Sequence, residues 1–240
     1  MIWLSNNTNC ELAESLKAAE DLSLWRNEMS TYILTSMFPN GFNAQTIEIF
    51  RQKITKRKKF AFVASEFEKI HEKTDYYFHY FLNMFEEVGI HFEKTYVIDG
   101  RMSVGEAQKA VTEADVIWLS GGDTPTQFQY FQEYGLDTVI KQHGGIIIGM
   151  SAGSINMAKI SICTLSCGHY KQDIYNGLGC VDISVEPHFV RSEVSNELID
   201  LSKKYTIYGL CDDSFIVCSE KTIEFYGEIY KLSHGNIERL

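Results

Sequence analysis

The chain has 240 residues, of which 45% are hydrophobic, and its formal net charge is −10. This length suits one α/β domain, and the acidic balance argues against nucleic acid or an anionic membrane as a partner. No apolar stretch approaches the roughly 20 residues that span a bilayer, and no signal peptide is recognised. The six cysteines lack the paired spacing of a zinc site. We therefore expect a reduced, cytoplasmic protein without a membrane partner.

Two parts of the chain differ in character. Residues 1–28 have a weak helical periodicity and are interpreted as an N-terminal extension, whereas residues 29–240 form a single predicted domain. Strands and helices alternate along its first half, with strands predicted over 32–36, 60–64, 95–98 and 116–119 and helices over 44–55, 75–88 and 104–114. The aromatic residues of 75–88 recur at helical spacing and are assigned to the core.

The C-terminal third contains several short apolar runs. A strand is predicted over 181–185, and 206–211 is expected to be one more strand of the main sheet. Short antiparallel strands follow over 215–218, 223–226 and 228–232. The sequence therefore predicts an α/β fold with a mostly parallel sheet, helices on both faces and antiparallel strands near its C-terminus.

The apolar run Ile146–Ile148 leads to the pattern Gly149-x-Ser151-x-Gly153. A serine between two such glycines, directly after a buried strand, is typical of a nucleophile elbow, which exposes the hydroxyl at the strand's carboxyl end. The following helix would direct its first N–H groups toward an oxyanion at this hydroxyl. Ser151 is therefore the candidate nucleophile.

A serine nucleophile needs a base within hydrogen-bonding reach. His188 is the best candidate because it follows a predicted strand through Pro187, and His169 is the second. Asp212, in the loop after the 206–211 strand, could orient the imidazole. Asp173 and Asp182 remain alternative orienting acids.

Three motifs in chain order carry a family resemblance: Ser120–Thr124, Gly149–Ser154 and Glu186–Phe189. Together they resemble the peptidase E (aspartyl dipeptidase) family from about residue 32 to the C-terminus. They also resemble cyanophycinase, a relative in the same serine-hydrolase superfamily. The resemblance implies a fold like that of the class I glutamine amidotransferases, which is flavodoxin-like.

The resemblance also implies roles for individual residues. Ser151 would be the nucleophile of a serine peptidase, and His188 its general base and later general acid. The oxyanion hole would use the N–H of Ala152 and a glycine N–H from Gly121 and Gly122. The implied substrate is a small peptide, and neither a metal nor an organic cofactor is implied.

The third catalytic residue and the substrate are less directly implied. Some relatives have an acid about fifteen residues after the nucleophile, where this chain has Ser166, and others have a glutamate where Asp212 stands. We predict Asp212 as the acid. The side-chain carboxylate of an N-terminal aspartate in the substrate needs a cation to bind it, and Arg191 is the candidate. Glu186, by contrast, stands where asparagine is more typical of peptidase E, and it would favour a substrate with a basic group.

Several alternatives remain open at this point. An α/β-hydrolase esterase would share the elbow but would have its acid between serine and histidine. A glutamine amidotransferase would have cysteine in place of Ser151. The sequence also fits a cyanophycinase-like or other acyl hydrolase, or a catalytically degenerate binding protein on the same fold. It does not define the oligomeric state, for which a homodimer is one possibility.

Overall fold

A seven-stranded sheet forms the centre of the computed structural model, which describes residues 30–240. The proposed extension over 1–28 lies outside the described residues. The sheet has the order β11-β10-β1-β5-β4-β2-β3. Its five parallel strands are β1 (Thr31–Thr35), β2 (Lys59–Val63), β3 (Lys94–Ile98), β4 (Val116–Leu119) and β5 (Ile146–Met150).

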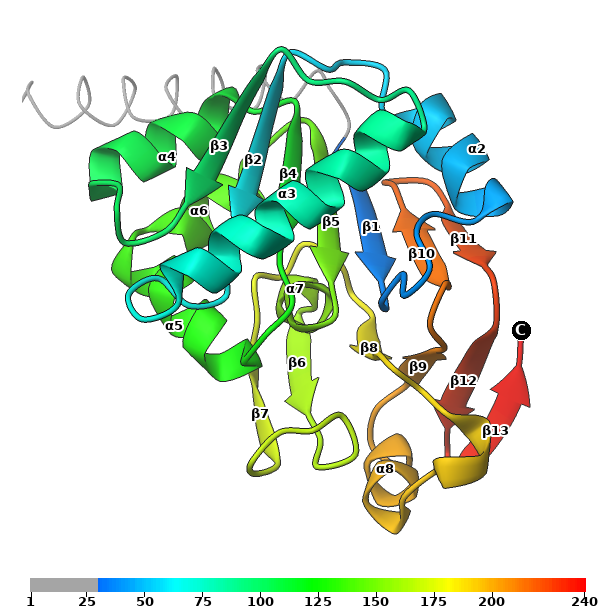
Figure 1. Ribbon diagram of the computed structural model, residues 1–240. Helices are drawn as coiled ribbons and strands as arrows, with labels where there is room; N and C mark the ends of the chain where they lie inside the picture. The colour runs from blue at the N-terminus through cyan, green and yellow to red at the C-terminus, as the bar shows by residue number, and fades with distance from the viewer. Residues whose placement is uncertain (1–29) are drawn as a thin grey trace, which may run out of the picture.

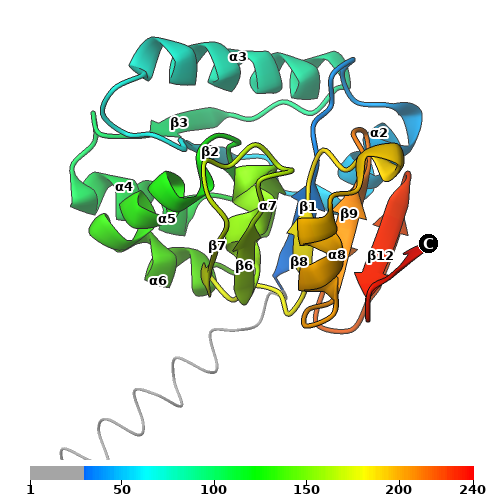
Figure 2. The ribbon, with the colours of Figure 1, turned by 90° about the horizontal axis from the view of Figure 1, so that it is seen from below.

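Helices cover both faces of this sheet, as Figures 1 and 2 show. Neighbouring residues of a strand point to opposite faces, so that each of the five parallel strands contributes to two hydrophobic clusters. One face packs against α2 (Ala44–Lys53) and α3 (His71–Glu87). The other packs against α4 (Val104–Glu113), α5 (Thr124–Glu133), α6 (Leu136–Lys141) and α7 (Ala152–Met157). The α/β fold predicted from the sequence is confirmed.

The aromatic side chains of α3 form much of the core on their face of the sheet. Phe81 and Phe85 lie with their ring centroids 4.7 and 5.7 Å from that of Trp118 on β4. All three side chains are fully buried, and such aromatic pairs stabilise a core beyond the area that they bury. These contacts hold α3 diagonally across this face of the sheet (Figure 1).

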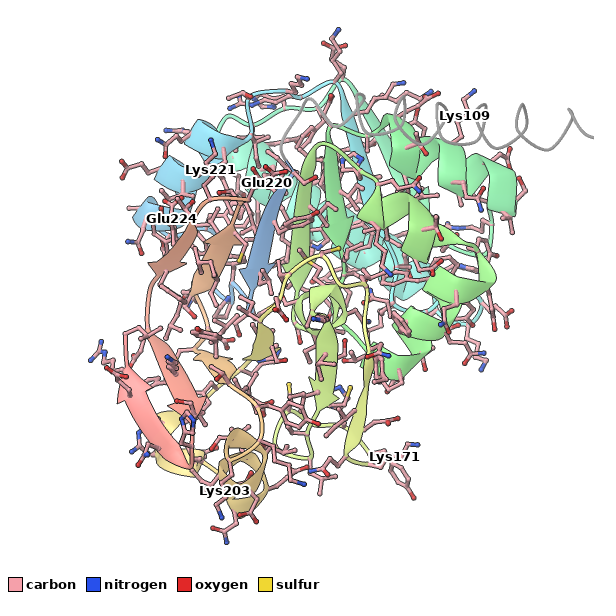
Figure 3. All side chains as sticks on the ribbon, turned by 180° about the vertical axis from the view of Figure 1, so that it is seen from behind. Lys109, Lys171, Lys203, Glu220, Lys221 and Glu224 are labelled. Atoms are coloured by element: carbon pink, nitrogen blue, oxygen red, sulfur yellow. The ribbon has the colours of Figure 1, made fainter. Side chains whose placement is uncertain are left out.

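The edge of the main sheet beside β1 is antiparallel. β10 (Phe215–Cys218) pairs with β1, and β11 (Ile223–Tyr226) pairs with β10. Glu224 on β11, labelled in Figure 3, forms an ion pair with Lys53 of α2 at 3.1 Å. The other charged residues labelled in Figure 3 also lie on the outside of the molecule.

The prediction that 206–211 belongs to the main sheet is wrong. β9 (Ile207–Leu210) lies in a second sheet, of order β13-β12-β9-β8, with β8 (Ser184–Glu186), β12 (Ile229–Ser233) and β13 (Asn236–Arg239). A buried strand has the same apolar run in either sheet, so its sequence does not specify its neighbours. The place beside β1 is taken by β10 instead.

Three smaller elements complete the described fold. A two-stranded hairpin, β6 (Ile160–Cys163) with β7 (Asp173–Asn176), follows α7. The short 3-10 helix Arg191–Glu193 and α8 (Asn196–Ser202) connect β8 to β9. The carboxyl ends of the parallel strands point toward β8 and β9 (Figure 1). No helix within residues 30–240 is long and apolar enough to cross a membrane.

Candidate active site

Ser151 lies in a sharp turn between β5 and α7. Its φ of 50° and ψ of −107° are values that residues other than glycine rarely adopt. The turn is tied to β1, because Ser151 N–H donates to the Thr35 carbonyl at 3.0 Å and the Ser154 hydroxyl bonds the Thr35 and Gly149 carbonyls at 2.8 and 2.6 Å. A Cβ at Gly153 would collide with the Leu119 carbonyl oxygen. These contacts explain both the strain and the glycine of the pattern.

His188 and Asp212 form a hydrogen-bonded row with Ser151. His188 Nε2 lies 3.0 Å from Ser151 Oγ, and His188 Nδ1 lies 3.0 Å from Asp212 Oδ1. Since an ionised carboxylate can only accept, this row requires the proton on Nδ1 and leaves Nε2 free to accept the serine proton. The residues come from three different strand ends, those of β5, β8 and β9.

Ser36, at the end of β1, connects the base and the acid. Its hydroxyl donates to Asp212 Oδ1 at 2.7 Å and accepts the backbone N–H of His188 at 2.8 Å. The N–H of Met37 also reaches Asp212 Oδ1, at 3.3 Å. Ser36 was not among the site residues predicted from the sequence, although a polar residue at the carboxyl end of a predicted buried strand is a signal that could have found it.

The alternative base and acids contact other partners. His169 lies 2.7 Å from Thr124 Oγ1 through Nε2 and 3.0 Å from the Thr164 carbonyl through Nδ1. Asp173 pairs with Lys171, and the highly exposed Asp182 pairs with Lys159. The structure therefore brings Asp212, and neither of these aspartates, to the imidazole of His188.

The predicted oxyanion-hole residues border the same space as Ser151. Gly121 and Gly122 follow β4 and line the cavity beside Ser151, and Ala152 is the first residue of α7. A Cβ at Gly122, whose φ is 149°, would collide with the Ser65 hydroxyl. Within residues 30–240, the N–H groups of Gly121, Gly122 and Ala152 donate to no protein group. Such N–H groups can stabilise a developing oxyanion.

Glu186 is a second carboxyl group near His188, but its environment is very different. It is 3% exposed, and its Oε1 accepts hydrogen bonds from Thr164 Oγ1 at 2.7 Å and Ser166 Oγ at 2.9 Å. Burial raises the pKa of Glu186 to about 7 despite these two hydrogen bonds. Ser166, where some relatives have an acid, thus supplies a hydroxyl to a neighbouring buried carboxyl.

A cavity of about 370 Å³ opens beside Ser151 and His188. Residues of α3 and β2 form one wall of this cavity. The aromatic residues of 75–88 were predicted to belong to the core, but one of them, Tyr77, is 37% exposed and lines the cavity. Lys73 of α3 lines the cavity. Arg191, the predicted substrate cation, instead lies exposed on the 3-10 helix and is not among the lining residues.

A serine in a strained turn, hydrogen-bonded to an imidazole that is itself bonded to a carboxylate, is the arrangement of serine hydrolases, which recurs on unrelated folds. A family model, that of peptidase family S51, matches residues 33–226. This match covers more than half of the chain, and the chain belongs to peptidase family S51. The membership supports a serine peptidase of the peptidase E type, in agreement with the resemblance found in the sequence.

Solved structures with the same fold include two peptidases. A peptidase from an acI-B1 Actinobacterium is 16% identical, with a TM-score of 0.67 over 89% of this chain and 94% of that chain. A putative peptidase E protein from Listeria monocytogenes EGD-e is 20% identical, with a TM-score of 0.62 over 82% of this chain and 98% of that chain. At these identities the likeness shows the fold alone. Among curated proteins, none matches the sequence significantly.

Proposed function

We propose that the protein hydrolyses small peptides through an acyl-enzyme on Ser151, with His188 as the base and Asp212 as the orienting acid. The observation that carries this proposal is the continuous row of hydrogen bonds, 3.0 Å from Asp212 to His188 and 3.0 Å from His188 to Ser151. Each group is the type that its neighbour needs, because a serine hydroxyl is a poor nucleophile until a base removes its proton.

The proposed reaction has two steps. Ser151 Oγ attacks the peptide carbonyl while His188 Nε2 takes its proton, and the N–H groups of Ala152 and Gly121 or Gly122 stabilise the oxyanion. The imidazolium then gives the proton to the leaving amine as the C–N bond breaks. In the second step water loses a proton to His188 Nε2 and attacks the acyl carbonyl. The bond from Ser151 Oγ to the acyl carbon then breaks, and the imidazolium returns the proton to Ser151 Oγ as the acid product leaves.

A preference for N-terminal aspartate is not retained in this proposal. The cation predicted for it, Arg191, is exposed and lies outside the set of residues that line the cavity beside Ser151, and Lys73, which does line the cavity, is outnumbered there by the carboxyl groups of Glu66 and Asp123. Accordingly, Arg191→Ala should leave the ratio of kcat/KM for Asp-Leu and Ala-Leu unchanged. A loss of activity toward Asp-Leu alone would restore Arg191 as the substrate cation.

Two observations favour peptide hydrolysis over the other functions considered. The acid follows His188 in the chain, as Asp212, whereas an α/β-hydrolase esterase has its acid before the histidine. A degenerate binding protein would lack a complete row of groups, but here Asp212 supplies the carboxylate that is absent at Ser166. A cyanophycinase-like activity uses the same chemistry on another amide and differs only in substrate.

Labelling with a fluorophosphonate probe, followed by peptide mapping, tests the mechanism. We expect the label on Ser151 in the wild-type protein and little label in His188→Ala, because the hydroxyl is activated only by the imidazole. The control is Ser219→Ala, which changes a serine of the β10–β11 turn. Labelling of a different serine, or equal labelling of Ser151 in His188→Ala, would contradict the proposal.

A further inference from the structure

The cavity beside Ser151 has an apolar wall built from three elements. Phe62 on β2, Phe81 on α3 and Met150 on β5 line it and are 1%, 0% and 6% exposed, while Ile70 and Tyr77 are each 37% exposed. Its volume is about 370 Å³, and a cavity of about 150 Å³ is enough for a benzene molecule. The space therefore admits a large apolar side chain together with part of a peptide backbone.

The strand order decides which half of a peptide meets this wall. In the main sheet β5 lies between β1 and β4. His188 approaches Ser151 from the β1 side, because Ser36 at the end of β1 holds its backbone N–H. Phe62 and Gly121, by contrast, come from β2 and the end of β4, on the other side of β5.

The direction of proton transfer places the substrate. The leaving amine takes its proton from His188, so the leaving group departs on the β1 side. The residue that contributes the carbonyl then extends to the opposite side, toward β2 and α3. The side chain that enters the apolar cavity is thus that of the acyl residue, which in a dipeptide is the N-terminal one.

The charges that line the cavity oppose an acidic side chain there. The residues that line it include two carboxyl groups, those of Glu66 and Asp123, and one ammonium group, that of Lys73. Burial acts to raise the pKa of Glu66, but hydrogen bonds from the N–H groups of Glu68 and Lys69 and from the Tyr130 hydroxyl outweigh it and hold that pKa below its usual value. A substrate carboxylate would lose water against aromatic rings and meet a net negative lining, which is unfavourable.

We propose that this cavity selects peptides with a large apolar acyl residue, such as phenylalanine, leucine or methionine, over peptides with an acidic one. Tyr77 is the specificity-determining residue at the rim of the cavity. The proposal rests on the proposed function only in taking Ser151 as the point of attack. Its physical basis is the transfer of apolar side-chain area from water to the aromatic wall.

The first test compares kcat/KM for Phe-Leu, Leu-Leu, Met-Leu, Ala-Leu and Asp-Leu. We expect the three bulky apolar residues to exceed Ala-Leu by about tenfold or more, and Asp-Leu to be the poorest substrate. Equal values for Phe-Leu and Ala-Leu, or a higher value for Asp-Leu, would overturn the inference.

Two pairs of neighbouring residues on and beside α3 provide matched variants. Tyr77→Ala should lower the Phe-Leu to Ala-Leu ratio by about fivefold, whereas Tyr76→Ala, at a residue that does not line the cavity, should not change it. Lys73→Met should keep or increase the preference for Phe-Leu, with Lys69→Met as its control. The opposite result would be that Asp-Leu is the best substrate of the wild-type protein and that only Lys73→Met loses this activity. The cavity would then bind acidic side chains of the substrate instead.

Binding to a Ser151→Ala variant separates this inference from the proposed function. Isothermal titration calorimetry should show tighter binding of Phe-Leu than of Asp-Leu, and Tyr77→Ala in the same background should weaken only Phe-Leu. If the wild-type protein hydrolysed no peptide while this binding preference held, the proposed function would fail and the inference would stand. Equal binding of both peptides, or no binding of either, would overturn the inference even if peptides were hydrolysed.

Discussion

The two sides of the candidate active site are held in place by different means. Ser151 lies between a buried strand and α7, all six of whose residues are buried. His188 and Asp212 come from the second sheet, and their side chains are 42% and 43% exposed. Dense packing between backbone and small side chains positions the nucleophile, whereas a few hydrogen bonds around Ser36 position its partners.

This difference predicts different sensitivities. A packed turn responds to added volume, because its neighbours are backbone atoms that cannot move aside without cost. A hydrogen-bonded pair at a half-exposed position responds to the loss of a donor or acceptor, and its loss affects the reaction more than the stability of the fold. The five predictions below test this contrast.

The largest effect is expected for His188→Ala. Removal of the base should lower kcat by about 10⁵-fold, because the serine hydroxyl then has no acceptor for its proton. The melting temperature should change little, since the imidazole is half exposed. The control is His169→Ala, whose ring contacts Thr124 and Thr164 instead. Similar losses in both variants would show that the imidazole of His188 has no special role.

Asp212→Asn should be the next most damaging. An amide in this position would favour the wrong imidazole tautomer, and kcat should fall by about 10³-fold to 10⁴-fold with KM nearly unchanged. Asp213→Asn is the matched control, because the neighbouring residue does not contact His188. Steady-state kinetics with one peptide distinguishes the two. Full activity in Asp212→Asn would exclude Asp212 as the orienting acid.

Gly153→Ala tests the packed side. The added Cβ would meet the Leu119 carbonyl oxygen, and we expect a loss of about 2–3 kcal/mol in the free energy of unfolding together with loss of fluorophosphonate labelling. Gly105→Ala on α4 is the control, since a Cβ there meets no atom within 4 Å. Urea denaturation measures both. Unchanged stability in Gly153→Ala would show that the elbow can relax.

Glu186→Gln should change how stability depends on pH. The folded-state pKa of Glu186, about 7, lies above the ordinary value of 4.5 for this side chain, so the folded form favours the protonated carboxyl. Its contribution to stability is complete below pH 4.5 and is lost as the pH rises through about 7, by about 3 kcal/mol. Glutamine cannot ionise, so between pH 4.5 and 8 the variant should gain roughly this much relative to the wild-type protein.

Urea denaturation at pH 4.5 and pH 8 measures this gain. Glu193→Gln, at an exposed residue, is the control and should follow the wild-type protein at both pH values. A constant difference between Glu186→Gln and the wild-type protein across this range would mean that Glu186 is already ionised in the fold.

Ser36→Ala should have the smallest effect on the reaction. It removes one hydrogen bond to Asp212 and one to the His188 backbone, and we expect kcat to fall by about tenfold with KM unchanged. Ser36→Thr, which keeps a hydroxyl, should recover part of the loss. A fall in kcat at unchanged KM, with part of it recovered by Ser36→Thr, is a result that a purely structural role of Ser36 would not produce.

Much of the fold and half of the site can be predicted from local sequence. The elbow is recognisable because its requirements are local: an apolar run, a serine and glycines where a Cβ would collide. The helix caps are local as well, since Ser103 and Glu106 form a capping box and Asp123 caps α5. Prediction of the parallel sheet succeeded for the same reason, because buried strands keep continuous apolar runs.

Only the tertiary structure decided the rest. Strand 207–210 belongs to a second sheet, and Ser36, Tyr77 and Lys73 border the site, because pairing between strands and contacts between distant segments depend on the whole chain. The sequence alone identified Ser151 and the family motifs, whose geometry is enforced by neighbours along the chain. The meeting of Asp212 with His188, and the apolar wall opposite them, required the arrangement of two sheets and a helix in space.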